Sequence, residues 1–366
     1  MLPISRSQRS KTVYRIIRRN FGKTFSPLGT ALMMAIVRLK VRFFMWLDTL
    51  FFPSFRKTGI TAPLVIAGNP RSGTTFLHRY LIKSGIGAGC KLRQLLWPSF
   101  IMQKMIRPFL PLLERFSPAK NHSAAAHETN LDSAETDDAA LLFRYFDGFF
   151  LYGFFLAWAE EDLFPWIDPR IRDTSTRDYN WLEQVWIRVL AESGATRIIP
   201  KLFSVSVNMP RFLKRFPEAR VLYLVRDPLS VIPSGMSLVT GVLDQRFGFW
   251  NLPQDRRRHY LNRLYRALVE LLLRFHDDWV NERIDRSRVM IVTYPRMMQE
   301  FETVMTEILG FIGHHPSPEL LQDITERAEA QRNWQSKHTY DLEKFGLTAE
   351  QIEKDCALIY STFLNE

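Results

Sequence analysis

The stretch from residue 64 to residue 81 constrains the fold of this chain more than any other segment. Residues 64–67 form a short apolar run that ends at a glycine, which predicts a buried strand. Residues 76–83 carry apolar side chains at helical spacing and no proline, which predicts a helix. A strand, a tight turn and a helix start gather free backbone N–H groups at the positive end of a helix dipole, so this segment predicts an anion site, most often for phosphate. The turn itself is rich in glycines and hydroxyls: Gly68, Ser72, Gly73, Thr74 and Thr75.

The cation in this turn distinguishes it from the loop of nucleoside triphosphatases. Gly68 and Gly73 have the triphosphatase spacing, but Thr74 stands where that loop has its lysine. The lysine reaches the β- and γ-phosphates, so its absence counts against hydrolysis of ATP or GTP. The cation here is Arg71, whose planar fork suits a tetrahedral oxyanion. The alternative is a tight turn without a ligand. It is disfavoured because the strand, the glycines, the hydroxyls and the helix all fit an anion site.

The composition is that of a globular protein with an uneven charge distribution. With 366 residues, 46% of them hydrophobic, the chain can bury a large core. Residues 1–57 account for the whole net charge of +11, because they hold twelve Lys/Arg and one acid, Asp48, whereas bases and acids balance in the remainder. A neutral globule with a basic arm argues against a nucleic-acid partner. Cys90 and Cys356 are too few for a disulfide framework and lack metal-ligand spacing, so we expect a reducing, cytoplasmic location and no metal.

Residues 1–58 are interpreted as a basic, apolar arm that precedes an α/β domain at residues 59–366. The longest charge-free run of the arm, residues 24–37, has fourteen residues, short of the ~20 that span a bilayer. No small-residue cleavage site follows, so a signal peptide fits poorly. A basic segment rich in Phe, Trp and Met can lie at an anionic membrane surface, and a packing helix with a solvated basic tail is the alternative.

A second candidate ligand site follows the fully apolar run at residues 221–225. Such a run is expected of a strand in a parallel sheet that is covered on both faces. Asp227 is a good N-cap for a following helix, and we expect Pro233 to break that helix early. Arg226 is then left at the carboxyl end of the strand, where open α/β sheets bind ligands, with Ser234 at the break.

Two further stretches contain polar or aromatic residues of interest. An acidic stretch leads into a predicted helix from residue 139, where acids favour the helix dipole; its candidates are His127, Glu135, Asp137 and Asp138. Residues 146–158 are the most aromatic part of the chain, and core packing is the usual explanation. The other interpretation is an apolar pocket wall that suits a lipid-like or aromatic alcohol.

Four segments together resemble the sulfotransferases that use 3′-phosphoadenosine-5′-phosphosulfate (PAPS). Residues 70–75, Pro-Arg-Ser-Gly-Thr-Thr, are similar to their 5′-phosphosulfate loop, in the Arg-Ser-Gly-Thr-Thr branch of bacterial sulfotransferases. Residues 226–234 are similar to the 3′-phosphate site, and residues 197–201 to a strand that ends in a lysine. Residues 133–142 are similar to an acidic segment, commonly Pro-x-Glu-Asp-Glu, before an apolar helix.

The resemblance covers roughly residues 62–366 and is incomplete at two of its segments. Ala134 and Thr136 replace the proline and the first acid of the acidic triplet. Leu202 and Phe203 stand where Ser-Pro or Asn-Pro usually follows the lysine. These departures keep open a non-catalytic, membrane-associated protein that binds adenosine 3′,5′-bisphosphate (PAP). A nucleotide kinase or triphosphatase on a similar fold is the enzyme alternative.

The resemblance implies a single α/β domain with a P-loop-like parallel sheet and helices on both faces. It implies sulfuryl transfer from PAPS, without a metal, to a hydroxyl or amine of a small acceptor, such as a lipid-like or other hydrophobic alcohol or a carbohydrate. A lysine at a strand end can stabilise charge on the leaving oxygen, and a solvated surface lysine is the alternative. The resemblance implies that residues 71–75 bind the 5′-phosphosulfate and that Arg226 and Ser234 bind the 3′-phosphate. It also implies that Arg71 and Lys201 stabilise the leaving group. The implied general base is Glu135, Asp137, Asp138 or His127.

Overall fold

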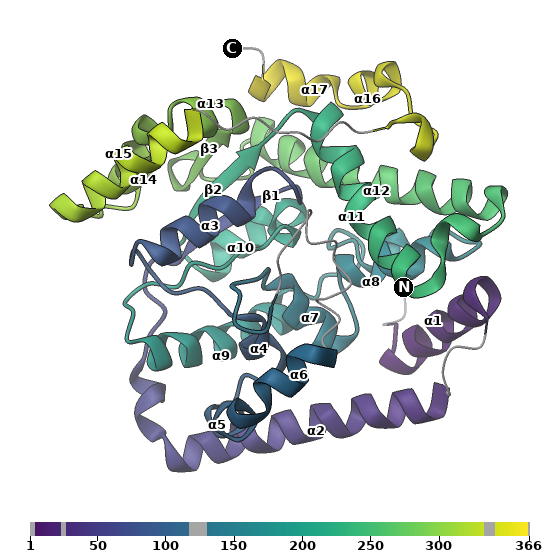
Figure 1. Ribbon diagram of the computed structural model, residues 1–366, viewed down its shortest axis with the longest axis horizontal. Helices are drawn as coiled ribbons and strands as arrows, with labels where there is room; N and C mark the ends of the chain where they lie inside the picture. The colour runs from purple at the N-terminus through teal and green to yellow at the C-terminus, as the bar shows by residue number, and fades with distance from the viewer. Residues whose placement is uncertain (1–3, 23–26, 117–129, 333–340, 365–366) are drawn as a thin grey trace. The chain divides into compact units, whose positions relative to one another are not determined.

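The computed structural model describes residues 4–22, 27–116, 130–332 and 341–364 of the chain (Figure 1). The chain forms two compact units, each assembled from three separate stretches. We call them the helical unit, residues 1–60, 89–196 and 236–267, and the sheet unit, residues 61–88, 197–235 and 268–366. The chain passes from one unit to the other within α11 (Pro228–Phe247) and α12 (Gln254–Val280), as well as near residues 60, 88 and 196.

A parallel sheet forms the centre of the sheet unit (Figure 1). Its strands are β1 (Leu64–Gly68), β2 (Arg220–Val225) and β3 (Val289–Thr293), paired in that order and found where the sequence predicts them. The register aligns Ile66 with Leu222, and Leu222 with Met290. Every residue of β1 is buried, as are all but the first of β2. Burial on both faces explains why these strands have continuous apolar sequences rather than alternating ones.

Helices cover both faces of this sheet. On one face, Ile66 and Leu222 share an apolar cluster with α3 (Thr74–Lys83), α13 (Tyr294–Gln299), α14 (Phe301–Phe311) and α15 (Pro318–Arg332). On the other face, Tyr223 stacks on Phe275 of α12, which also contacts Phe363 near the C-terminus. The predicted α/β class with a helix-flanked parallel sheet is therefore confirmed. Shorter helices complete the unit: α10 (Met209–Arg215), α16 (Ala349–Asp355) and α17 (Ala357–Ile359).

The strand predicted before Lys201 exists as a line of backbone pairing rather than as a full strand. The carbonyls of Ile198 and Pro200 accept hydrogen bonds from the N–H groups of Leu64 and Ile66 at 3.0 and 2.9 Å. An isolated parallel bridge joins Ile66 to Lys201. Pro200 has no N–H to donate, which weakens the ladder at that point. Lys201 nevertheless lies beside β1, as a strand-end lysine would.

The prediction that Pro233 ends its helix early is wrong. α11 runs from Pro228 to Phe247 with Pro233 inside it. Its start is as predicted, because the carboxylate of Asp227 accepts a backbone hydrogen bond at 3.0 Å from the second helical residue. Pro233 removes one hydrogen bond of the helix, but Ile232 and Met236 beside it are completely buried. Tertiary packing therefore compensates for the lost bond, and Ser234 lies within the helix.

The helical unit contains the remaining helices, with no strand among its described residues. The helix α9 ends at Gly194, which has a left-handed conformation. Three short helices, α4, α5 and α6, lie between residues 92 and 116. The unit comprises α1 (Arg6–Phe21), α2 (Pro27–Phe51), α4 (Leu92–Leu96), α5 (Phe100–Ile106), α6 (Leu110–Phe116), α7 (Asp138–Tyr145), α8 (Phe149–Phe154) and α9 (Ser175–Ser193).

A buried acid fastens α2 to its neighbours in the helical unit. Asp48, the one acid of residues 1–57, is completely buried. It accepts hydrogen bonds from the Ser99 hydroxyl at 2.8 Å and from the N–H of Phe100 at 3.1 Å, at the start of α5. It also pairs with Arg188 of α9 at 3.0 Å. The arm is thus packed within this unit, while the domain boundary predicted near residue 58 stays a prediction.

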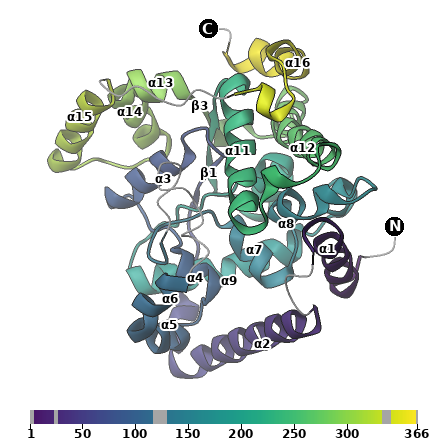
Figure 2. The ribbon, with the colours of Figure 1, turned by 45° about the vertical axis from the view of Figure 1, so that its right-hand side comes forward.

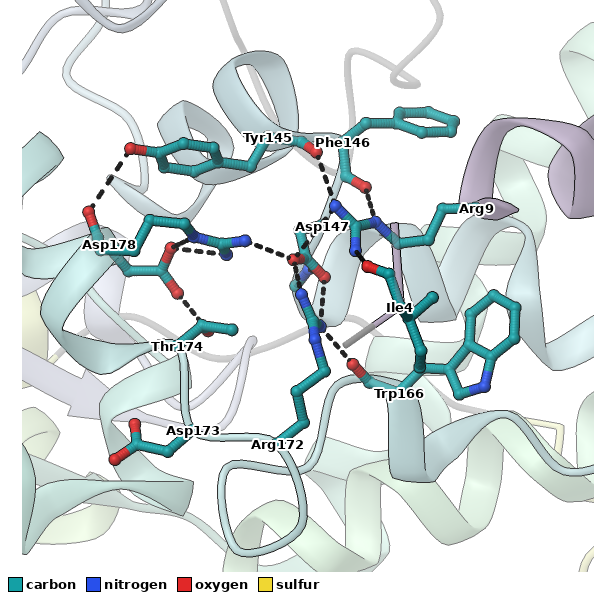
Figure 3. Close-up of polar contacts among 12 residues, drawn as sticks. Ile4, Arg9, Tyr145, Phe146, Asp147, Trp166, Arg172, Asp173, Thr174 and Asp178 are labelled. Atoms are coloured by element: carbon teal, nitrogen blue, oxygen red, sulfur yellow. Dashed lines mark hydrogen bonds and ion pairs between the residues drawn. The ribbon is translucent and has the colours of Figure 1, made fainter. Parts of the chain in front are cut away.

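A second buried acid holds α1 (Figure 3). Arg9, Arg172 and Arg177 all pair with the carboxylate of Asp147, at 3.6, 2.5 and 2.9 Å. Arg9 also donates to the backbone carbonyl of Phe146 at 3.0 Å. Burial opposes the charge of Asp147, but the hydrogen bond from Arg172 and the charges of the three arginines prevail and lower its pKa.

Candidate functional site

The turn after β1 has a shape that only glycine permits at two positions. Gly68 and Gly73 have φ angles of +120° and +88°. A Cβ on Gly68 would collide with the carbonyl of Leu224, and one on Gly73 with the side chain of Met297. Arg71 also has a positive φ, of 79°, which is uncommon for a residue with a side chain. The turn is therefore specified by local conformation and by close packing together.

The helix after the turn begins in a way that suits an anion. α3 starts at Thr74, and Gly73 before it provides no side-chain cap. Its first-turn N–H groups are thus not capped by the side chain at that position, and they lie at the positive end of the helix dipole. Ser72 and Thr74, both predicted site residues, are buried within the turn. The backbone of the predicted phosphosulfate loop has the geometry that the sequence indicated.

Lys201 is buried against this turn. Its ammonium group donates to the hydroxyl of Thr75 at 3.1 Å, and only 7% of the residue is exposed. Both residues belong to the sheet unit, which brings them together from distant parts of the chain. The alternative of a solvated surface lysine is therefore wrong.

A histidine that the sequence did not single out supports the segment that bears Lys201. His78 of α3 is completely buried, and its Nε2 lies 2.8 Å from the carbonyl of Ile199. Burial, followed by the charge of Lys201, lowers the pKa of His78 to about 3, so the ring is neutral at physiological pH. The carbonyl is an acceptor, so Nε2 carries the proton and donates it. This bond ties α3 to the residues just before Lys201.

The two predicted phosphate arginines are joined through one chain of hydrogen bonds. The Nε of Arg71 donates to the Ser234 hydroxyl at 2.9 Å. Arg226 donates to the backbone carbonyl of Arg71 at 3.0 Å. The guanidinium of Arg226 also lies 4.2 Å from the ring centroid of Tyr294, the first residue of α13. Arg71, Arg226 and Ser234 thus meet at the carboxyl ends of β1 and β2.

The neighbouring carboxylate of Asp227 is engaged elsewhere. It accepts a hydrogen bond from the hydroxyl of Tyr360 at 2.6 Å and caps the start of α11. Burial, with the bond to Asp227, raises the pKa of the Tyr360 hydroxyl. These contacts hold the Asp227 carboxylate at the start of α11 and against Tyr360.

Among the acidic candidates, Asp137 has a structural role. It is completely buried and accepts a hydrogen bond from the indole N–H of Trp186 on α9 at 2.8 Å. Cys90 lies in the same buried environment, where burial and then the charge of Asp137 raise the pKa of the thiol. A carboxylate held in this way binds α9 to the start of α7.

Glu135 and Asp138 are the remaining described candidates for a base, and both belong to the helical unit. Asp138 is the first residue of α7, as the sequence indicated, and accepts from the hydroxyl of Thr136 at 2.9 Å. Glu135 is 7% exposed, and its backbone N–H donates to the carbonyl of Cys90 at 3.0 Å. His127 lies outside the described residues. Within the described ranges, no group of three or more His, Cys, Asp or Glu is arranged to hold a metal ion.

Comparison with known proteins identifies the family. The description "Sulfotransferase family" matches residues 63–318, more than half of the chain. The fold is shared with the crystal structures of sulfotransferase STF1 from Mycobacterium tuberculosis H37Rv (TM-score 0.70, 16% identity, covering 96% of this chain and 92% of that one) and of STF9 from Mycobacterium avium (TM-score 0.68, 19% identity, covering 97% and 91%). A search of curated proteins finds no match to the sequence. The family match, together with the strand–turn–helix that carries Arg71, leads to one conclusion: this chain belongs to the sulfotransferase family.

Proposed function

We propose that this protein transfers the sulfuryl group of PAPS to a hydroxyl or amine of an acceptor molecule. Sulfuryl transfer in general follows from the family. PAPS is proposed as the donor because Ser234, Arg71 and Arg226 form a chain of hydrogen bonds. PAPS has two anionic ends, a 5′-phosphosulfate and a 3′-phosphate, and a donor site needs a cation for each.

Each anionic end of PAPS is assigned to one of the two arginines. The uncapped N–H groups at the start of α3, with Arg71, would hold the 5′-phosphosulfate. Arg226 and Ser234 would hold the 3′-phosphate. Arg71 donates to the hydroxyl of Ser234 and Arg226 to the carbonyl of Arg71, and bonds of this kind orient a guanidinium without cancelling its charge.

Lys201 would act at the bond that breaks. Transfer forms a bond between the acceptor oxygen or nitrogen and sulfur, and it breaks the bond between sulfur and the oxygen that bridges to the 5′-phosphate. Negative charge develops on that bridging oxygen, and a lysine hydrogen-bonded to Thr75 of the loop is suited to stabilise it. Positioning of the two reactants supplies the rest of the acceleration, and no metal is required.

The acceptor proton needs a base, which we propose to be Glu135, Asp138 or His127. Asp137 is the weakest candidate, because its carboxylate already binds the indole of Trp186. Asp138 and Glu135 are carboxylates in buried surroundings, where a base is shielded from bulk water. Single neutralising substitutions, Glu135→Gln, Asp138→Asn and His127→Gln, should identify the base as the one that abolishes turnover and preserves PAP binding. If all three variants retain turnover, the base lies elsewhere.

For the acceptor we propose a hydrophobic alcohol. Its support is the aromatic run at residues 146–158, of which part is core: Trp158 stacks on Tyr260, and both are buried. Other members are only half-buried: Phe149, Phe150, Phe154 and Phe155. A carbohydrate or amine acceptor is the competing possibility, and a screen of acceptor classes with labelled PAPS distinguishes them.

The donor is tested by thermal unfolding with nucleotides. PAP should raise the melting temperature, because it carries both phosphates, and AMP should not, because it lacks the 3′-phosphate. Stabilisation by ATP with Mg²⁺ and none by PAP would overturn the donor and favour a kinase or triphosphatase. Binding of PAP without turnover of labelled PAPS on any class of acceptor would instead favour the non-catalytic alternative.

A further inference from the structure

The long helix α2 is apolar on two opposite sides. Its inner side includes Val41 and Met45, which are buried in the helical unit. The outer side carries large apolar residues three or four positions apart, which form one stripe along the helix. This outer stripe consists of Leu32, Ile36, Leu39, Phe43, Trp46 and Leu50, with exposed fractions between 44% for Ile36 and 68% for Leu39. A surface helix of a globular protein normally places polar residues there.

Bases flank the outer stripe on both sides. At about 100° per residue, Lys40 and Arg42 project about 80° to either side of its centre line. Both are exposed. The third base of this segment, Arg38, is directed inward instead and donates to the carbonyl of Phe143 at 3.2 Å; burial, followed by neighbouring arginines, lowers its pKa to about 10. Asp48 is buried on the inner side, so the outer side of α2 has an apolar centre and basic margins without an acid.

Neighbouring helices of the same unit also expose apolar residues and bases. α2 and α5 lie side by side, and a short 3₁₀ helix, Arg107–Phe109, joins α5 to α6 (Figure 1, Figure 2). Large apolar residues and bases are again exposed there: Met105, Phe109 and Leu112, with Lys104 and Arg107.

We propose that the outer stripe of α2 docks on an anionic lipid bilayer, with the helix lying parallel to the membrane. The apolar residues would enter the boundary between headgroups and acyl chains, while Lys40 and Arg42 contact lipid phosphates. Aromatic and aliphatic residues on one side and bases along its margins are the pattern of interfacial helices. The proposal is independent of the sulfuryl-transfer reaction.

Two observations favour this occupant over others. A second copy of the chain would bring Lys40 and Arg42 of one protomer toward the same bases of the other, since a twofold interface pairs identical surfaces. A spanning helix is disfavoured as well, because Asp48 fastens α2 to Arg188 and Arg38 is bonded to the inner side. Among the described residues, no single helix is long and apolar enough to cross a membrane, and only a bent pair, Asp138–Tyr145 with Phe149–Trp158, passes that test by length and composition.

An environment-sensitive dye on the outer stripe tests the proposal directly. The native thiols Cys90 and Cys356 are both buried, so a cysteine introduced by Leu39→Cys can be labelled selectively in the full-length folded protein. Its emission should shift to the blue with vesicles of phosphatidylcholine and phosphatidylglycerol, and not with phosphatidylcholine alone. The shift should fade at 1 M salt, where the screening length falls to about 3 Å. The same dye at Leu321→Cys, an exposed position on α15, should not respond.

Co-sedimentation with the same vesicles separates the apolar and basic contributions. Phe43→Ser with Trp46→Ser should reduce vesicle binding at least tenfold, since two large side chains no longer enter the lipid. Lys40→Gln with Arg42→Gln should reduce it by about fivefold for each base removed. Matched controls elsewhere, Leu321→Ser with Leu358→Ser and Lys214→Gln with Lys354→Gln, should bind as the unchanged protein does.

Two results would overturn the proposal. One is the absence of a blue shift at Leu39 and of sedimentation at low salt. The other is a blue shift that needs no vesicles and grows with protein concentration, together with a dimer in analytical ultracentrifugation, which would identify a second copy as the occupant. Thermal unfolding and far-UV circular dichroism of each variant without ligand verify that the fold is intact.

Discussion

Two clusters of arginine in this molecule use their charge in opposite ways. In the helical unit, Arg9, Arg172 and Arg177 surround the carboxylate of Asp147 (Figure 3). In the sheet unit, Arg71 donates to a hydroxyl, and Arg226 donates to a carbonyl and lies against the ring of Tyr294. The first set shares one buried carboxylate, whereas the bonds from Arg71 to Ser234 and from Arg226 to the carbonyl of Arg71 orient a guanidinium without cancelling its charge.

The difference indicates how a structural arginine can be told from a ligand-binding one. A guanidinium that pairs with a buried carboxylate contributes to folding, because removal of either partner leaves a buried charge uncompensated. A guanidinium held by hydroxyl, carbonyl or aromatic groups keeps its attraction for an anion. The comparison therefore predicts that substitutions in the first cluster alter stability, and that substitutions in the second alter ligand binding.

The largest effect is expected from Asp147→Ala. Three guanidinium groups would lose their shared carboxylate, and the free energy of unfolding should fall by about 3–5 kcal/mol. Urea unfolding measures this change, with the exposed Glu353→Ala as a control that should alter stability little. PAP should still raise the melting temperature of the variant. A loss of stability under about 1 kcal/mol would contradict the comparison, because the ion pairs of Asp147 would then contribute little to folding.

Lys201→Met should lower kcat by about 100- to 1000-fold, because the charge that develops on the leaving oxygen loses its partner. PAP affinity, measured by calorimetry, should change far less, since the contact strengthens mainly in the transition state. Lys214→Met, at an exposed lysine of the same unit, serves as the control. Equal losses in kcat and in PAP affinity would assign Lys201 to donor binding rather than to catalysis.

Arg226→Ala should weaken PAP binding by about 1.5–3 kcal/mol, the range of a charge-assisted hydrogen bond. Its free energy of unfolding should stay close to that of the unchanged protein, in contrast with Asp147→Ala. Calorimetric titration and urea unfolding on the same preparation give both numbers. A variant that loses stability yet binds PAP normally would place Arg226 in the structural class and reverse the comparison.

A smaller effect, measured between pH 6.5 and 5.5, concerns the neutral His78. Its pKa is about 3 in the folded chain and about 6.5 in the unfolded chain, so below pH 6.5 the unfolded state binds the additional proton. Stability is therefore complete above pH 6.5 and falls as the pH decreases toward 3, by about 1.4 kcal/mol per pH unit from this residue. His78→Gln should remove that slope between pH 6.5 and 5.5 in urea unfolding, and His315→Gln, at an exposed histidine, should not. Parallel slopes for the unchanged protein and His78→Gln would contradict a neutral buried ring.

Local sequence was sufficient to predict the strands and the position of the two arginines of the proposed donor site. β1 and β2 are continuous apolar runs because both of their faces are covered, and the residues that follow them, Arg71 and Arg226, lie where strands of a parallel sheet end. Lys201 and Ser234 were predicted through short family patterns, although Pro233 does not break α11. Proline disfavours a helix locally, but the burial of its neighbours Ile232 and Met236 stabilises α11 across Pro233.

The remaining features depend on residues far apart in the chain. Asp48 pairs with Arg188, and Asp147 pairs with Arg9, although about 140 residues of sequence separate the two members of each pair. Helical or strand periodicity does not relate residues so far apart. Tyr360 and His78 likewise find their partners only in the folded sheet unit. Such pairs have no signature in a single sequence, because each acid or base by itself is typical of a solvated surface.

The hydrogen bond from Arg226 to the carbonyl of Arg71 makes the two ends of the proposed donor site energetically dependent on each other. The direction of that carbonyl is set by the left-handed backbone at Arg71, so a distortion at one phosphate position is transmitted to the other. In a double-mutant cycle with Arg71→Ala and Arg226→Ala, one at each end, the combined variant should therefore lose PAP affinity by an amount that differs from the sum of the single losses by about 0.5 kcal/mol or more. A nucleotide with a single phosphate end would bind without this coupling, so the loop would recognise both ends of the donor together.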